Sequence, residues 1–191
     1  MPSAKIFDAS SYILIGGLSR RFGSPKWKAN VNNVQIIDHL WDVCKDFQSC
    51  HIIGKTKPEG MSYPFLQDQL DVQSPIIGLL TALNHSDKDW IFLISCDLPL
   101  MTSETIQSIR TLGDQSADAI VPLVNDFKQP ICAFYHKRIL ENVQSMVSKN
   151  ELRLKNILDE IQSDYVVMDA FEKEFTNMNT VEDLERILEI L

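Results

Sequence analysis

Short apolar runs alternate with amphipathic segments along the chain, and this alternation restricts the fold more than any other feature. Apolar runs of strand length occur at residues 12–15, 51–54, 64–67, 90–95, 119–122, 129–135 and 165–168. Apolar residues at helical spacing occur at 35–48, 76–83, 103–112, 137–147, 152–161 and 180–191. Strands that alternate with helices predict an α/β protein with a mostly parallel sheet, in which the run Trp90–Ser95, apolar up to Ile94, is a central strand.

The length and composition are typical of a single globular domain. A chain of 191 residues with 45% hydrophobic residues can bury a sizeable core. We therefore expect one domain over residues 1–191, with residues 1–10 as a loose leader and Thr180 capping the last helix. No apolar run approaches 18 residues and the first 11 residues hold no signal-peptide core, so neither a membrane span nor a secreted protein is expected.

The overall charge limits the kinds of partner. A net charge of -8, from 18 basic and 26 acidic residues, argues against a general nucleic-acid binder. The 4 cysteines are scattered without a CxxC pair, which is typical of a reduced cytoplasmic protein with no zinc site. The 4 histidines have no ligand spacing, so solvated or packing roles are expected for them.

A glycine-rich basic stretch follows the first apolar run. Tyr12–Ile15 is followed by two glycines, and from Gly16 to Lys28 the chain carries four cationic residues and no acid. Glycine amides can wrap phosphate oxygens, and Lys and Arg can balance their charge. The stretch is neither a Walker A loop, because Gly23 and Lys26 are not adjacent, nor a GxGxxG motif. Residue chemistry alone leaves two interpretations, a polyphosphate-binding loop and a basic surface turn.

Two aspartates are further candidates for a site. Asp97 follows the central strand, where ligands bind in open α/β sheets, and its carboxylate suits Mg²⁺ next to bound phosphates. It could equally cap a turn before Pro99. The carboxylate of Asp68 could accept hydrogen bonds from a ligand. Asp71 is its neighbouring alternative, and a solvated loop acid is the plainer interpretation of both.

The basic stretch resembles the signature of the MobA-like nucleotidyltransferases. The pattern GG-x-S-x-R-[FM]-G-x-x-K corresponds here to Gly16, Gly17, Ser19, Arg21, Phe22, Gly23 and Lys26. Other segments resemble family elements in the same order along the chain: 65–71 with 74–78, 94–99, 129–135 and 177–180. The resemblance covers nearly the whole chain and implies a Rossmann-like three-layer α/β/α sandwich with a mostly parallel mixed sheet, as in nucleotide-diphospho-sugar transferases.

The resemblance also implies roles for individual residues. The residues implied in catalysis are Arg21, Lys26 and Asp97. Those implied in nucleotide binding are Leu14, Ile15, Gly16, Gly17, Ser19, Arg20, Lys26, Asp68, Gly78 and Asp97. Mg²⁺ would be held by Asp97, with Asn179 completing the shell. Asn177, Asn179, Gln129 and Pro130 would lie towards the pterin, and Asn179–Thr180 could also simply cap the last helix.

The implied reaction is the Mg²⁺-dependent transfer of GMP from GTP to molybdopterin carrying molybdenum, which gives the guanine dinucleotide form and pyrophosphate. Such a transfer needs positioning and charge neutralisation rather than a nucleophile, in keeping with the lack of a recognisable triad. Other cofactor-biosynthesis proteins and apo-molybdoenzymes are the implied partners. The alternatives are a related transferase that uses CTP or a sugar phosphate, and a non-catalytic homologue that binds nucleotide or cofactor. Lys26 and Asp97 together speak against the non-catalytic one.

The preference for GTP over CTP rests on one sequence detail. The chain also departs from the family pattern at four places. Guanylyl members carry Gly-Gly where cytidylyl members carry Ala-Gly, and this chain has Gly16-Gly17. Ile15 and Ser74 replace a family alanine and glycine, and Gly54 replaces an asparagine. Residues 150–154 replace the common G-x-x-SL. These departures bear on the base and the pterin site more than on the fold.

Overall fold

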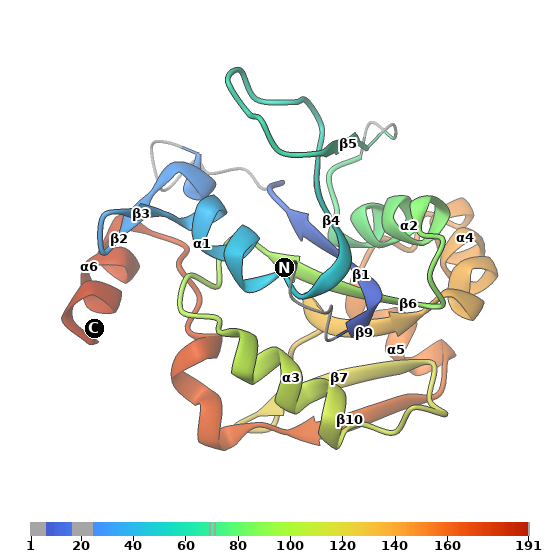
Figure 1. The fold of residues 1–191 in the computed structure, drawn as a ribbon. Coiled ribbons are helices and arrows are strands. Elements are labelled where there is room, and N and C mark those ends of the chain that lie inside the picture. Colours follow the sequence, from blue (N-terminus) through green and yellow to red (C-terminus); the bar gives the residue numbers. More distant parts are fainter. Residues whose placement is uncertain (1–6, 17–24, 69, 71, 191) are drawn as a thin grey trace, which may run out of the picture.

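A mixed eight-stranded sheet forms the centre of the molecule (Figure 1). The computed structural model describes residues 7–16, 25–68, 70 and 72–190. Across the sheet the strands follow the order β10-β7-β9-β6-β1-β4-β5, and β8 pairs with β7. The strands are β1 (Phe7–Leu14), β4 (Phe47–Gly54), β5 (Phe65–Gln67), β6 (Trp90–Ser95), β7 (Ala119–Val124), β8 (Phe127–Lys128), β9 (Cys132–His136) and β10 (Ser163–Val167).

The pairing pattern confirms a mixed sheet. β1 runs parallel to both neighbours, β4 and β6, and the β4–β5 and β10–β7 pairs are also parallel. β9 is antiparallel to β6 and β7, and β8 is antiparallel to β7. β6 occupies the middle of the strand order and β5 one edge, as predicted for residues 90–95 and 64–67.

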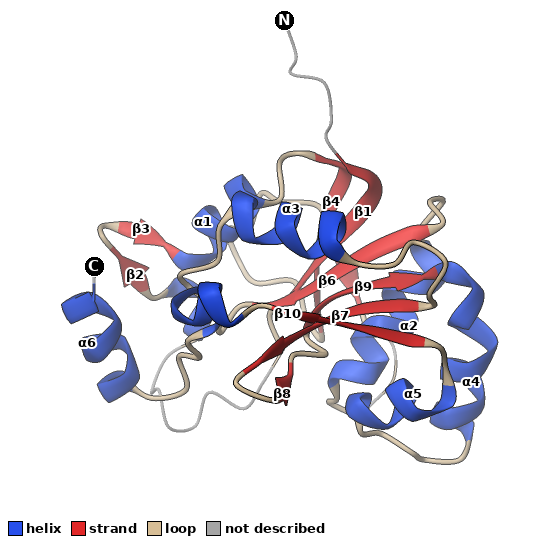
Figure 2. Cartoon of the chain, turned by 90° about the horizontal axis from the view of Figure 1, so that it is seen from below, coloured by secondary structure: helices blue, strands red, loops and turns tan. Residues whose placement is uncertain are grey.

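Helices cover both faces of the sheet and make three layers (Figure 2). The alternation of side chains along the strands explains this, because Ile13 and Phe92 point into one core and Tyr12 and Leu93 into the other. The first core packs against α1, α3 and α6 and the second against α2, α4 and α5. The helices are α1 (Ile36–Val43), α2 (Pro75–His85), α3 (Ser103–Leu112), α4 (Leu140–Ser148), α5 (Leu154–Glu160) and α6 (Val181–Ile190).

Smaller elements surround the sheet. A hairpin of β2 (Asn30–Val31) and β3 (Val34–Gln35) turns at Asn32 and Asn33, which both have positive φ. The 3₁₀ helices among the described residues are η2 (Lys26–Lys28), η3 (Lys137–Ile139) and η4 (Asp169–Phe175). α3 is capped by Thr102, whose side chain accepts a hydrogen bond from the N–H of Thr105. No helix in the described part of the chain is long and apolar enough to cross a membrane.

Several predicted boundaries were wrong. The leader does not extend to residue 10, because Phe7 and Ala9 are buried and β1 already begins at Phe7. The helix predicted at 35–48 ends at Val43, and Phe47 instead begins β4, where its ring stacks on Phe7 at 4.4 Å. The strand predicted at 129–135 is β9, which begins only at Cys132, because the N–H of Gln129 is turned back to Pro122 O.

Candidate active site

The candidate site lies at the carboxyl ends of β1, β4 and β6. The connection from β1 to β4 carries α1 on one face of the sheet, and the connection from β5 to β6 carries α2 on the other face. The strand order therefore reverses beside β1, and open α/β sheets bind ligands in the crevice at such a point. The end of β1 is fixed on both sides, because Ile15 N–H donates to Ile53 O at 3.0 Å and Cys96 N–H donates to Leu14 O at 3.0 Å.

A cavity of about 240 Å³ opens at this place. Its walls come from the ends of β1, β4, β5 and β6, from the first turn of α2 and from the residue before β9. The residues that line it are Leu14, Gly16, Ile53, Gly54, Lys55, Asp68, Gln73, Ser74, Pro75, Gly78, Ser95 and Ile131. Four residues predicted to bind nucleotide, namely Leu14, Gly16, Asp68 and Gly78, are among them.

Two buried glycines let the cavity walls approach closely. A Cβ atom on Gly78 would lie 2.6 Å from Cδ2 of Leu14, so a side chain there would force the buried Leu14 side chain or α2 to shift. A Cβ on Gly54 would lie 3.0 Å from Cγ1 of Ile15 and 3.3 Å from Cζ of Phe65. Gly54 and the bulky Ile15 therefore fit together sterically.

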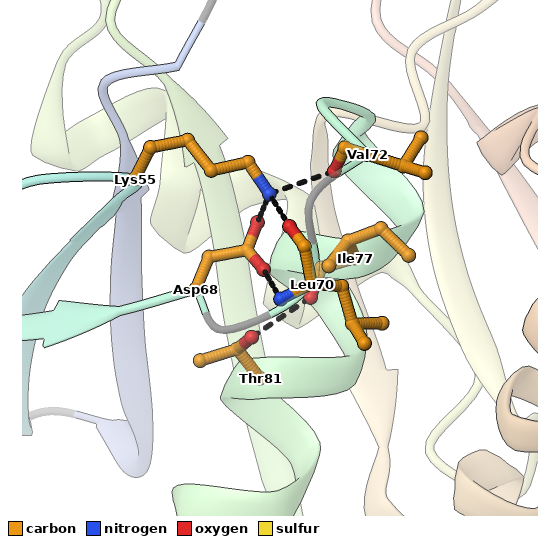
Figure 3. A network of polar contacts seen from close by, with 6 residues as sticks. All are labelled: Lys55, Asp68, Leu70, Val72, Ile77 and Thr81. Atoms are coloured by element: carbon orange, nitrogen blue, oxygen red, sulfur yellow. Dashed lines mark hydrogen bonds and ion pairs between the residues drawn. The ribbon is translucent and has the colours of Figure 1, made fainter.

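Lys55 and Asp68 form a polar network at the cavity wall (Figure 3). Lys55 Nζ lies 3.0 Å from Asp68 Oδ2 and donates to Val72 O at 2.7 Å and to Leu70 O. Asp68 Oδ1 accepts from Leu70 N–H at 3.2 Å. Asp68 is only 8% exposed, so this ion pair is largely withdrawn from water. The sequence analysis predicted Asp68 but missed Lys55, because no local sequence pattern indicates that a lysine after a strand forms an ion pair with an aspartate 13 residues away.

Lys26 and Asp97 come together through the segment before α6. Met178 N–H donates to Asp97 O at 2.8 Å, and the next residue, Asn179, accepts through Oδ1 from Lys26 Nζ at 2.8 Å. Lys26 lies in η2 and Asp97 directly after β6. Three residues predicted for catalysis or metal binding, distant in sequence, therefore belong to one cluster.

The cap of α6 fixes the asparagine segment. Thr180 Oγ1 accepts from Asp183 N–H at 3.2 Å, and Asp183 Oδ2 accepts from the N–H groups of Asn179 and Thr180, both at 2.9 Å. These donors lower the pKa of the Asp183 carboxyl. The predicted cap at Thr180 is confirmed, and the reciprocal bonds hold the backbone of Asn179 while its side chain faces Lys26. Asn177 is exposed on the same segment.

The charges of this cluster act on two buried thiols. Burial and the Asp97 carboxylate raise the pKa of Cys96 to about 12, and the Lys26 ammonium opposes this shift. Burial and Asp97 also raise the pKa of Cys132. Both thiols therefore stay protonated at neutral pH, and neither has the thiolate character of a nucleophile.

Gln129 and Pro130 lie in the loop before β9. Ser95 N–H donates to Ile131 O at 3.1 Å, which ties this loop to the end of β6. Pro130 O accepts from the Tyr135 hydroxyl at 2.6 Å. Gln129 is half-buried, and its side-chain amide donates a hydrogen bond to Phe127 O at 3.4 Å. Both residues are therefore next to the site, on the β9 side.

Four predicted residues, Gly17, Ser19, Arg20 and Arg21, lie outside the described residues. Ile15 is described and packs between the ends of β1 and β4. The carboxylate of Asp97 is of the ligand type that Mg²⁺ takes, since this ion is commonly held by one or two carboxylates together with phosphate and water. Within the described ranges no group of three or more His, Cys, Asp and Glu residues is arranged as a metal site.

The sheet order, the covering helices and the cavity at this edge are those of an open α/β protein that binds its ligand at the carboxyl ends of the strands. The sequence profile of the MobA-like NTP transferase domain matches residues 11–164. The chain belongs to this family.

Individual relatives agree with this assignment. A probable molybdenum cofactor guanylyltransferase of Bacillus subtilis (strain 168) is 32% identical over 180 residues, which cover 90% of each chain. One from Bacillus licheniformis is 30% identical over 192 residues, covering 92% of this chain and 94% of the relative. A solved structure from Aquifex aeolicus VF5 has 27% identity and a TM-score of 0.75, covering 90% of this chain and 93% of that one.

One further solved structure bears on the fold alone. Molybdopterin-guanine dinucleotide biosynthesis protein A from Archaeoglobus fulgidus has a TM-score of 0.81 at 20% identity, covering 95% of this chain and 97% of that one. The predicted three-layer fold with a mixed sheet is therefore confirmed.

Proposed function

We propose that this protein is a molybdenum cofactor guanylyltransferase. It would transfer GMP from GTP to the terminal phosphate of molybdopterin carrying molybdenum, with release of pyrophosphate. The printed descriptions of relatives that span nine-tenths of both chains support this function. The observation that carries it is the cluster of Lys26, Asp97 and Asn179 beside the cavity at the ends of β1 and β6.

The geometry suits an in-line displacement at the α-phosphate. The nucleoside would occupy the cavity between β1, β4 and α2, with the Asp68 carboxylate in contact with the guanine base. Lys26 would bind the triphosphate and balance the charge that passes to pyrophosphate as the leaving group departs. The glycine amides and arginines of residues 16–24 are proposed to share this role.

Asp97 is proposed to hold Mg²⁺, with Asn179 next to it. When bound, the ion would neutralise phosphate charge and orient the leaving group. Asn177, Asn179, Gln129 and Pro130 are proposed to face the pterin, because their segments border the same strand ends. The Asn179 side chain currently accepts from Lys26, so it can orient this lysine as well as contact the acceptor.

We further propose that the chain works as a single nucleotidyltransferase domain in the cytoplasm, with no nucleic-acid or membrane partner. Apo-molybdoenzymes and other proteins of cofactor biosynthesis are the expected partners. The acidic balance of -8 supports the absence of a nucleic-acid partner, because phosphate backbones bind basic surfaces.

Thermal unfolding with GTP, CTP, ATP and UTP, each with and without Mg²⁺, tests the function. A ligand at 100 times its Kd adds about 2.7 kcal/mol to the free energy of unfolding, which is readily seen as a rise in Tm. We expect a rise with GTP that increases with Mg²⁺, followed by pyrophosphate release when molybdopterin is added. A rise with CTP alone would indicate a cytidylyltransferase. No rise with any nucleotide would favour a non-catalytic homologue.

A further inference from the structure

We propose that Lys55 is a positioning residue that sets the base preference of the nucleotide site by fixing the orientation of the Asp68 carboxylate. This inference rests on the proposed function, since it assumes that the base of GTP lies in the cavity. Lys55 follows Gly54 at the end of β4 and lines the cavity together with Asp68.

The ammonium group of Lys55 is fully engaged. It has three hydrogens, and it contacts three oxygens: Asp68 Oδ2 at 3.0 Å, Val72 O at 2.7 Å and Leu70 O. Figure 3 shows these contacts converging on Nζ beside the first turns of α2. The side chain of Lys55 is 29% exposed and that of Asp68 7%, so the lysine contacts a carboxylate with little water around it.

The Asp68 carboxylate is held on both oxygens. Oδ2 accepts from Lys55 and Oδ1 accepts from Leu70 N–H at 3.2 Å, while the backbone N–H of Asp68 donates to Gly54 O at 2.9 Å. A carboxylate has about four acceptor positions. The chain uses one on each oxygen, and one on each oxygen is left for a ligand in the cavity.

Two adjacent acceptors match one base better than the others. Guanine presents two neighbouring donors, N1–H and N2–H₂, whereas adenine and cytosine pair a single amino donor with an acceptor nitrogen. A carboxylate held in one plane could accept from both guanine donors. A carboxylate free to rotate would no longer keep its two oxygens aligned with these two donors. A buried carboxylate without its cation would also repel a triphosphate.

The same lysine shapes the wall of the cavity. Its bonds to the carbonyls of Leu70 and Val72 hold the chain that leads into Gln73 and Ser74, and both of these line the cavity. The position of the carboxylate and the position of this wall therefore depend on one ammonium group.

Inosine triphosphate, which lacks the N2 amine, provides the test. We would measure Kd values of the full chain for GTP, ITP and ATP by calorimetry. The wild type should bind GTP at least ~10-fold more tightly than ITP, about the effect of one hydrogen bond to a charged group. Lys55→Met should reduce that ratio to within ~3-fold of unity, because the carboxylate no longer keeps its orientation.

Two variants control for charge and position. Lys57→Met removes an exposed lysine from the same loop and should leave the GTP to ITP ratio unchanged. Lys55→Arg keeps the cation beside Asp68 and should restore part of the ratio. If Lys55→Met does not fold, the double variant Lys55→Met with Asp68→Asn removes both charges, and it should bind GTP and ITP alike.

The outcomes separate this inference from the function on which it rests. A wild type that does not bind GTP overturns both. A wild type that prefers GTP, together with a Lys55→Met or double variant that keeps the GTP to ITP ratio, overturns the inference alone. A variant that weakens GTP, ITP and ATP equally shows a structural role only and also overturns it.

Discussion

The two halves of the candidate site are built in different ways. The half beside β4 and α2 is a cavity bounded by strand ends and the first turn of α2, with glycines at the closest approaches and an ion pair at one side. The half beside η2 and the end of β6 consists of Lys26, Asp97 and Asn179, all of which are half-buried or exposed. The first half is shaped by packing and the second by charge.

This difference matches what each half is proposed to do. A base is recognised by shape and by the direction of hydrogen bonds, so a packed wall with a fixed carboxylate is suitable. A triphosphate changes its charge distribution during transfer, and groups that contact water can bind, release and exchange with it. Substitutions in the packed half should therefore alter stability, whereas those in the charged half should alter turnover and affinity with the fold kept.

The largest effect is expected for Asp97→Asn. The variant keeps the shape of the side chain but removes its charge, so turnover should fall by about 10³-fold, or ~4 kcal/mol of transition-state stabilisation. The Tm should change by less than ~2 °C, because the carboxylate is only half-buried. Steady-state pyrophosphate release and thermal unfolding would measure the two quantities.

The pKa of the neighbouring Cys96 thiol provides a second measurement on the same variant. Asp97 raises the pKa of Cys96, so its neutralisation should lower that pKa from about 12 and increase alkylation at alkaline pH. Asp126→Asn, at an exposed turn with φ 64°, is the control and should change neither quantity. Near-normal turnover in Asp97→Asn would remove this residue from the metal role and contradict the proposed role of the charged half.

The next effect tests the packed half. In Gly78→Val the new Cβ would lie 2.6 Å from Leu14 Cδ2, and both residues are buried, so the free energy of unfolding should fall by ~3 kcal/mol. Gly16→Ala is the matched control, because its Cβ would meet Gln73 Nε2 at an ordinary 3.5 Å. That change should stay below ~1 kcal/mol in urea unfolding. Equal losses in the two variants would show that the cavity walls are not closely packed.

Lys26→Ala tests the charged half. Loss of the ammonium should weaken GTP binding by more than ten-fold, or ~1.4 kcal/mol, with little change in Tm, because its bond to Asn179 is an exposed one. Lys28→Ala, two residues further along η2 and exposed, should have a much smaller effect. Added salt should weaken GTP binding to the wild type more than to Lys26→Ala. An unchanged affinity in Lys26→Ala would contradict the phosphate assignment.

Sequence motifs indicated the residues of the charged half, and apolar periodicity indicated the fold, more directly than any sequence signal indicated the packing of the other half. The apolar run of β6 and the cap residue Thr180 are recognisable from local sequence, and both occur in the structure. Predicted element boundaries were wrong where tertiary contacts determined the structure. Phe47, for example, stacks on Phe7 of a neighbouring strand instead of extending α1.

Residues that depend on side-chain partners distant in sequence were harder to foresee. The proximity of Lys26 and Asp97 followed from a family motif, and not from spacing. Lys55 carried no motif, because its role depends on the ion pair with Asp68 and on two backbone carbonyls that only the fold brings within reach. The steric need for Gly78 likewise depends on Leu14, which belongs to another element.

The smallest effect concerns the contact between Lys26 and Asn179. Asn179→Ala removes the acceptor of this 2.8 Å bond, and the lysine then has more freedom to leave the phosphate. GTP binding should weaken about three-fold, or ~0.6 kcal/mol, at the low end for an exposed hydrogen bond. In a double-mutant cycle with Lys26→Ala, Asn179→Ala should add nothing further to the loss of GTP affinity, because the two residues act through one contact. Fully additive losses would mean that Asn179 contacts the nucleotide independently, and the charged half would then consist of separate groups rather than one ordered cluster.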